Sequence, residues 1–167
     1  MGDWADRFFE DWQQAWSTDT DAVMEHVTED IEYWDATLPE PIHGAEGYRE
    51  YVDVFFRAFS EIEWSLREPL IEEGDRVAEP WRCRALNSGP LSIGLPATGK
   101  RLETLGTGIF EFRDGKVCRE HSFYDVQSSM RQLGLWPPMG GVVEKATMSL
   151  AGLAVTTRRE LGARLGG

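Results

Sequence analysis

The sequence predicts an α+β cone: a curved antiparallel sheet with helices on its concave side, plus an added C-terminal helix. Helix-like apolar spacing dominates the first 60 residues, and four strand-like segments follow. Helices gathered before a set of strands favour this layer packing over an alternating βαβ arrangement. Trp, Phe and Tyr residues cluster in both parts, and a curved sheet covered by helices can enclose such rings around one open mouth. With 167 residues and 41% hydrophobic content, the chain can bury one real core.

The helices are predicted from apolar spacing and from capping residues. Near the start, aromatic residues recur at four-residue steps and so share one helical face: Trp4, Phe8, Trp12 and Trp16. Asp19 or Thr20 can cap a second short helix over residues 21–27. Residues 31–35 are predicted to form a strand. Residues 45–59 carry apolar side chains at steps of three and four, which predicts a third helix.

The next part of the chain is predicted to be mainly β-structure. Period-two or mixed strand patterns cover four segments: 62–71, 77–86, 101–112 and 117–124. The Asp-Gly pair at 114–115 predicts a tight hairpin between the last two, because this pair tolerates positive φ. Residues 87–100 form a long loop between two strands. Asp125 can cap a final helix that ends at Gly134.

Two parts of unequal size are predicted, a cone domain over residues 1–138 and a C-terminal amphipathic helix within residues 139–167. Pro137 and Pro138 break the helix that precedes them. The pattern over 142–165 is apolar on one side only, and its stripe lacks the aromatic anchors of a membrane-surface helix. We expect this tail to dock on the acidic helices of its own chain or of a partner.

Charge and composition exclude several classes of function. The formal net charge is −12, and the first 50 residues hold fourteen acids against two bases, so they carry all of it. An acidic surface repels phosphate backbones, so no nucleic-acid partner is expected. Neither a signal peptide nor an uncharged apolar stretch of 18 residues occurs, which predicts a cytoplasmic protein that does not enter the membrane. Two cysteines make no disulfide framework.

Signals for a cofactor or a metal are also missing. The three histidines, His26, His43 and His121, lie on different predicted elements and lack the spacing of a metal site. Serine-nucleophile and phosphate-loop motifs do not occur. The sequence therefore predicts no metal and no cofactor, and any chemistry must come from ordinary side chains.

Two aspartates are the candidate acid/base residues. Asp35 ends the run Glu32-Tyr-Trp-Asp35, and Asp125 ends His121-Ser-Phe-Tyr-Asp125. A carboxylate beside Trp and Tyr rings is poorly solvated, which disfavours its charged form and suits a general base or acid. The alternative interpretation is that each is only a turn former or a helix N-cap, because Asp favours both roles.

The aromatic residues predict an apolar pocket. We expect Asp35 and Asp125 to point into one cavity whose walls include four rings: Trp16, Tyr33, Phe59 and Trp81. Further substrate contacts are assigned to three residues: Trp12, Asn87 and Tyr124. Gly106 and Gly108 lie two apart in one strand, so both leave the same face of the sheet without a side chain. Missing side chains there allow a sharp bend or make room for a ligand.

Several motifs carry a resemblance to a known family. They are Trp12-Gln-Gln-Ala-Trp16, His43-Gly-Ala-Glu-Gly-Tyr-Arg49, Gly94-Leu-Pro-Ala-Thr-Gly-Lys-Arg101, Phe110-Glu-Phe-Arg-Asp-Gly-Lys116 and Tyr124-Asp-x5-Arg131-Gln-Leu-Gly134. Over roughly residues 8–135 the chain resembles the SnoaL-like polyketide cyclases of the nuclear transport factor two-like superfamily. The resemblance implies the cone fold and a homodimer paired through the outer face of the sheet. This superfamily hosts unrelated activities, so the chemistry needs separate evidence.

The resemblance also implies roles for particular residues. In the cyclases, the Asp before Arg-Gln-Leu-Gly is the general acid/base, which is Asp125 here, while Asn87 replaces a histidine frequent in the family. The spacing of Asp35 to Gly44 matches the proton-shuttling Asp of ketosteroid isomerases. Their oxyanion-holding acid aligns with Gly108, so Δ5-ketosteroid isomerisation itself is not expected.

The leading hypothesis is a cofactor-independent cyclase or isomerase for an apolar polyketide- or steroid-like carbonyl compound. Asp125 is the acid/base, Asp35 a second acid/base or electrostatic partner, and His121 or Tyr33 an oxyanion donor. One alternative is a non-catalytic lipophilic-ligand-binding or interaction domain whose mouth is covered by residues 142–165. Another is an epoxide-opening enzyme, which would need an Asp-Arg-Asp relay, and no Arg-x-Asp occurs in the appropriate strand.

Overall fold

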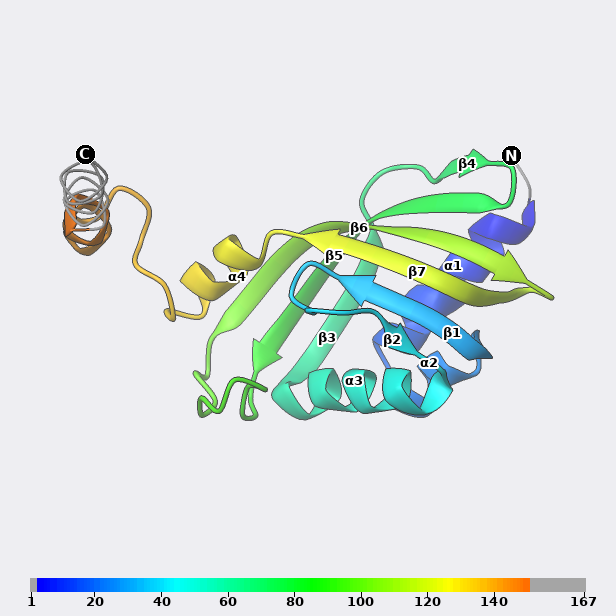
Figure 1. Cartoon of the computed structure of the whole chain (residues 1–167), viewed down its shortest axis with the longest axis horizontal. Helices are drawn as coiled ribbons and strands as arrows, with labels where there is room; N and C mark the ends of the chain where they lie inside the picture. The colour runs from blue at the N-terminus through cyan, green and yellow to red at the C-terminus, as the bar shows by residue number, and fades with distance from the viewer. Residues whose placement is uncertain (1–2, 151–167) are drawn as a thin grey trace, which may run out of the picture.

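The computed structural model of the chain describes residues 3–150 (Figure 1). Its helices are α1 (Asp3–Trp16), α2 (Thr20–Met24), α3 (Ala45–Ala58) and α4 (Val126–Gln132). Its strands are β1 (Val27–Asp35), β2 (Ile42–His43), β3 (Phe59–Leu66), β4 (Ile71–Glu73), β5 (Arg76–Asn87), β6 (Arg101–Arg113) and β7 (Lys116–Tyr124). A further helical segment, residues 142–150, lies at the end of the described chain. The predicted α+β class is confirmed.

The strands form one curved sheet in the order β2-β1-β7-β6-β5-β3, and β4 pairs with β5. The sequence predicted an antiparallel sheet, but the pairing is mixed. β1 runs parallel to β7, with Asp35 opposite Ser122. The other pairs are antiparallel. Hairpin turns can be recognised in the sequence, whereas the neighbour of β1 lies some 90 residues away along the chain and only tertiary folding selects it.

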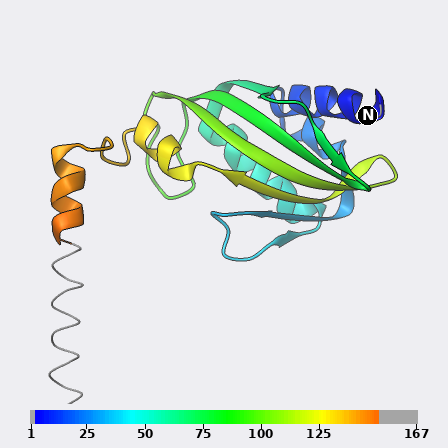
Figure 2. The same cartoon turned by 90° about the horizontal axis from the view of Figure 1, so that it is seen from above.

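The first three helices cover the concave face of the sheet (Figure 2). The aromatic stripe predicted for α1 is packed into the core, where Phe9 and Trp12 are each 1% exposed. Their rings meet Phe110 of β6 edge to face, at centroid distances of 5.0 and 5.8 Å. Pairs of this geometry add to the free energy gained by burying the rings. Helix α1 is therefore held against the sheet by the residues that also begin the cavity wall.

Local sequence signals fix several element boundaries. The Asp19 side chain accepts a hydrogen bond from Ala22 N at 2.9 Å and caps α2, as predicted. Asp114 and Gly115 have φ angles of 53° and 76°, which is the geometry expected of the predicted hairpin turn. The segment 62–71 is not one strand. β3 ends at Leu66, and β4 begins separately at Ile71. Each of the two strands pairs with β5.

The described part of the C-terminal segment, residues 139–150, stands apart from the cone in both views (Figures 1 and 2). Only residues 142–150 of the predicted tail helix fall within the described residues, and residues 151–167 lie outside them. Val142 is 84% exposed and Leu150 is 68% exposed, so this part contributes nothing to the core. Glu144 ties the segment to α4 through an ion pair with Arg131. Among residues 3–150, no helix is long and apolar enough to cross a bilayer.

We expect the protein to be a homodimer paired through the outer face of the sheet. Apolar side chains on that face remain partly open to solvent, with Leu105, Ile109 and Phe123 at 37%, 39% and 44% exposure. Light scattering at micromolar concentration should give twice the 18.9 kDa mass of one chain. Ile109→Glu should return the mass to that of the monomer, because it places a charge in the centre of the patch. A monomeric mass for the natural sequence contradicts this prediction.

Deleting the chain after Met139 should leave the cone folded. The described part of the tail adds no buried side chain, and its loss removes the ion pair with Arg131 and little else of the described contacts. Because the tail is mildly basic and the first helices are acidic, we expect weaker dimerisation or weaker ligand retention. Circular dichroism and light scattering on the truncated chain test both points. A truncated chain that fails to fold would show that the tail belongs to the core.

Candidate active site

A cavity of about 420 Å³ opens between the concave face of the sheet, helices α1, α3 and α4, and the loop at 91–93. Its wall is mainly apolar and rich in aromatic rings, because period-two alternation points every second strand residue inward and α1 and α3 add their own rings. Six of the seven predicted substrate contacts line it: Trp12, Trp16, Tyr33, Phe59, Trp81 and Tyr124. The described part of the tail, residues 142–150, does not line it.

Asp35 is fully buried directly behind this wall, at the end of β1. Its Oδ1 accepts hydrogen bonds from the backbone N and the Oγ1 of Thr37, both at 2.6 Å. Its Oδ2 faces three phenol groups, those of Tyr51, Tyr33 and Tyr124, at 2.8, 3.0 and 3.4 Å. Each of these partners lines the cavity. Asp35 therefore reaches the cavity through the side chains it orients.

The phenol groups around Asp35 stay neutral. Burial, followed by neighbouring negative charges and phenols, raises the pKa values of Tyr33 and Tyr51 well above their ordinary value. Burial and the charge of Asp35 raise the pKa of Tyr124 to about 12. A neutral phenol is a hydrogen-bond donor. Tyr124 has the longest of the three contacts with Asp35.

Asp125 does not share this cavity, and the prediction of an Asp35–Asp125 pair is wrong. Asp125 is exposed and caps α4, where its Oδ1 accepts a hydrogen bond from Ser128 N at 2.9 Å. The reason lies in strand alternation. Tyr124, the last residue of β7, points inward, so Asp125 falls at the strand-to-helix junction where an N-cap is required.

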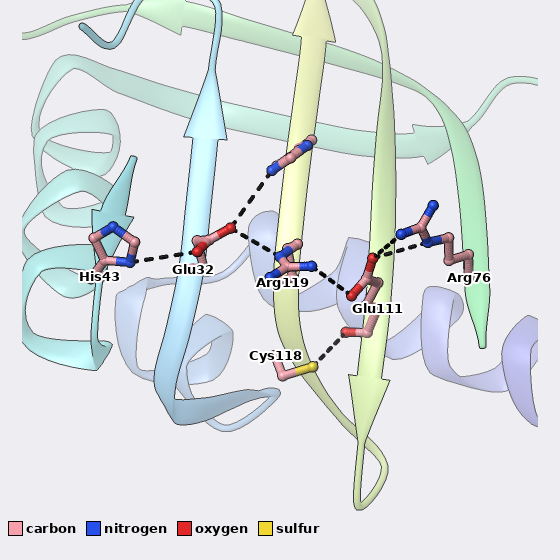
Figure 3. A network of polar contacts seen from close by, with 7 residues as sticks. Glu32, His43, Arg76, Glu111, Cys118 and Arg119 are labelled. Atoms are coloured by element: carbon pink, nitrogen blue, oxygen red, sulfur yellow. Dashed lines mark hydrogen bonds and ion pairs between the residues drawn. The ribbon is translucent and has the colours of Figure 1, made fainter. Parts of the chain in front are cut away.

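His121 lies on the opposite face of the sheet from the cavity, so it is not placed to donate to an oxyanion there. Its side chain is 41% exposed, with Nε2 3.9 Å from Glu32 Oε1. Glu32 belongs to a ladder of charges across the outer face (Figure 3). Arg119 contacts Glu32 at 2.9 Å and Glu111 at 3.0 Å, and Arg76 contacts Glu111 at 2.7 Å.

Asn87 has a structural role in place of the predicted substrate contact. It is fully buried and donates through Nδ2 to the carbonyl oxygens of Ala58 and Gly89, both at 2.9 Å. Its Oδ1 accepts from the backbone N and Oγ1 of Thr98, at 2.7 and 2.9 Å. These bonds fasten both ends of the long loop whose middle forms one rim of the cavity.

Two buried glutamates, Glu79 of β5 and Glu120 of β7, line the cavity and were not predicted. Glu79 is fully buried, and Glu120 is 5% exposed. The signal was present in the sequence as strand phase. Glu79 is two residues before Trp81, and Glu120 is four before Tyr124, so each shares the inward face of a predicted cavity residue. A charged residue in phase with apolar ones is informative because charges are rarely buried without a partner.

Burial changes the acidity of both glutamates. Desolvation raises the pKa of Glu79 to about 8, although a hydrogen bond from Gln13 Nε2 at 2.9 Å to its Oε1 opposes the change. Desolvation and then the charge of Glu79 raise the pKa of Glu120 to about 8, while a hydrogen bond from the Tyr48 hydroxyl at 3.3 Å opposes it. Groups with such values can both give and take a proton near neutral pH.

No basic side chain lines the cavity to neutralise these acids, because its described lining contains no Lys, Arg or His. Among residues 3–150, no group of three or more His, Cys, Asp or Glu side chains is arranged to hold a metal ion. The pKa values of Glu79 and Glu120 are therefore set by desolvation, by hydrogen bonds from phenol and amide donors, and by the charges of neighbouring acids.

Gly106 and Gly108 make room for aromatic side chains of the protein itself. A Cβ on Gly106 would lie 2.3 Å from the Trp81 ring, and one on Gly108 would lie 2.4 Å from the Phe110 ring. The two missing side chains thus let these rings lie flat against β6. Trp81 in turn forms part of the cavity wall, so the glycines shape the pocket indirectly.

The chain belongs to the SnoaL-like polyketide cyclase family, whose sequence model matches residues 6–133. The family resemblance in the sequence is thus confirmed. Comparison with curated proteins gives no significant sequence match.

Solved structures show the same fold. A candidate SnoaL-like polyketide cyclase from Jannaschia sp. CCS1 is 22% identical, with a TM-score of 0.69 over 81% of this chain and 94% of that one. AclR from Streptomyces galilaeus, described as a candidate hydroxylase, is 21% identical, with a TM-score of 0.70 over 92% and 95%. An LEH-like epoxide hydrolase from M. tuberculosis is 19% identical, with a TM-score of 0.60 over 78% and 89%. At these identities the similarity establishes the fold alone.

The buried glutamates should make the protein less stable as the pH rises. Between the ordinary pKa of 4.5 and about 8, folded Glu79 keeps a proton that the unfolded chain releases. Its stabilising contribution is complete below pH 4.5 and is lost as the pH rises through 8. Glu79→Gln should flatten the fall in unfolding free energy by up to about 1.4 kcal/mol per pH unit.

Urea unfolding at intervals from pH 5 to 8 measures this slope. Glu63 of β3 has a side chain that is 61% exposed, so Glu63→Gln serves as the control. This variant should keep the slope of the natural protein. An unchanged slope in Glu79→Gln would show that Glu79 is ionised throughout this range in the folded protein.

Proposed function

We propose that the cavity is the active site of a cofactor-independent acid/base enzyme, a cyclase or isomerase that acts on an apolar carbonyl compound. The observation that carries the proposal is a carboxyl group, Glu120, with a pKa of about 8 in the wall of a 420 Å³ aromatic cavity. A volume of this size accommodates a small multi-ring molecule. Family membership supports the same class of chemistry.

Glu120 is the proposed acid/base residue. The negative charges of the other two buried acids, Glu79 and Asp35, both raise its pKa. In its ionised form it removes a proton from the carbon next to the carbonyl group, and it returns that proton to another atom of the substrate. A pKa near the working pH allows both steps without a large cost in either direction.

The phenols around Asp35 are the proposed oxyanion donors. When the substrate loses its proton, negative charge develops on the carbonyl oxygen, and a neutral phenol can donate a hydrogen bond to it. We assign this role first to Tyr124, because it lines the cavity and its 3.4 Å contact with Asp35 is the longest of the three. Asp35 acts as a positioning residue that holds Tyr33 and Tyr51 through shorter bonds.

The epoxide-opening alternative has less support. The relay it needs contains an arginine between two aspartates, and the described lining of the cavity has no arginine. A non-catalytic binding domain would use the same apolar walls without moving a proton. A test of proton transfer therefore separates the enzyme from the binder.

Exchange of hydrogen for deuterium at the carbon next to a ketone measures the proposed step without the natural substrate. NMR should show faster exchange on a bicyclic ketone such as 2-decalone when the protein is added at pH 8. Glu120→Gln should lower this catalysed rate by about 10²–10⁴-fold, because it removes the acid/base group while keeping the shape. Tyr124→Phe should lower it by about tenfold or more through the lost donor.

Glu63→Gln, on an exposed part of the outer strand, is the matched control and should keep the full rate. Binding of the ketone with no exchange above the buffer rate would favour the binding domain. Equal rates for the natural protein and Glu120→Gln would assign the proton transfer to another group.

A further inference from the structure

The cavity carries an imbalance of charge that proton transfer alone does not require. Three acids are buried at or behind its wall, Asp35, Glu79 and Glu120, and its described lining has no basic residue. Arg76 and Arg119 of the sheet lie on the outer face, where they pair with Glu111 and Glu32 (Figure 3). Where these acids are ionised, the cavity repels anions and favours a ligand that brings a positive charge.

Glu79 supplies a specific position for such a charge. Its Oε1 is satisfied by Gln13, but its Oε2 has no hydrogen-bond partner in the described structure, although the residue is fully buried in the cavity wall. A buried carboxylate oxygen without a donor is costly. The carboxyl group can remain protonated, or a donor from a ligand can satisfy it. Proton transfer at Glu120 does not use this oxygen.

Several aromatic rings line the same cavity as Glu79. Trp81 follows Glu79 by two residues on the inward face of β5, and its ring lies 4.7 Å from that of Trp64 and 6.0 Å from that of Tyr124. Trp12 precedes Gln13 on α1 and lines the cavity. The face of an indole or phenol ring attracts an ammonium group, and more strongly where water is excluded.

We infer that the ligand of this cavity is an apolar ring compound that carries a protonated amine, with the ammonium N–H directed to Glu79 Oε2 and the charge held against the indole rings. The inference rests on the proposed function for the identity of the cavity and adds the second functional group of its substrate. The carbonyl end is then near Tyr124 and Glu120, and the amine end at Glu79 fixes the orientation.

Three probes of one shape test the inference on the full-length protein. They are N,N-dimethyl-1-(naphthalen-2-yl)methanamine, its neutral isostere 2-isobutylnaphthalene, and the anion 2-naphthylacetate. Quenching of tryptophan fluorescence measures each Kd at pH 7.5. The amine should bind at least about tenfold more tightly than the neutral isostere, and the anion should bind most weakly of the three. Glu79→Gln should abolish the preference for the amine, while Glu63→Gln keeps it.

A pH series on the unaltered protein gives a second test that does not depend on the folding of a variant. The amine stays protonated from pH 6 to 8, whereas Glu79 and Glu120 are still largely protonated at pH 6. Amine affinity should therefore rise by up to about tenfold per pH unit over this range, and the affinity of the neutral isostere should not. Asp35 also faces the cavity wall through its phenols, and Asp35→Asn should leave the direction of the effect unchanged.

Equal affinities for the amine and the neutral isostere, or an amine affinity that does not change with pH, would overturn the amine inference. The ketone exchange rate would then remain as the separate measure of the proposed function. Conversely, tight amine binding that depends on Glu79, together with no exchange of the ketone, would support the cationic ligand and overturn the acid/base enzyme.

Discussion

The parallel pairing of β1 with β7 is the constraint on which the site depends. It sets Asp35 opposite Ser122, so that the end of β1 lies beside the end of β7, where Tyr124 points into the same concave space. Tyr33 comes from β1 as well, and Tyr51 comes from the helix that follows it. Without this pair, Tyr124 would be separated from the acid and from the other two phenols. The same pairing joins β1 and β2 to the edge of the curved sheet.

Desolvation is the second physical factor, and it differs between the two faces of the sheet: carboxyl groups are buried on the concave face and reached by water on the outer face. On the concave side, the carboxyl groups of Glu79 and Glu120 are buried and no base is present among the described cavity lining residues, so their pKa values rise to about 8. On the outer side, Glu111 and Glu32 are bridged by Arg119, and water reaches all three side chains. Exposed pairs of this kind add little stability. Their consequence here is that positive charge is held outside the cone.

Keeping protonated acids inside an apolar cavity has a cost in stability. A hydrophobic residue at Glu79 would avoid the unpartnered Oε2 and the loss of stability as the pH rises. Groups with strongly altered pKa values in a cavity are typical of sites that move protons or bind charged ligands. The aromatic walls strengthen both actions because they exclude water, which would otherwise screen the carboxyl groups.

The sequence by itself determined the elements and much of the wall. The apolar spacing of α1, the Asp19 cap and the Asp-Gly hairpin were all found at their predicted places, because each depends on neighbours within a few residues. Strand alternation then placed Tyr33, Trp81 and Tyr124 on the inward face. Tertiary structure alone decided which acids matter. Asp125 resembled Asp35 in its local sequence, yet one caps a helix in water and the other is sealed behind three phenols, because solvation depends on residues from distant strands. For the same reason Glu79 and Glu120, ordinary strand glutamates in the sequence, became buried acids once the sheet curved around them.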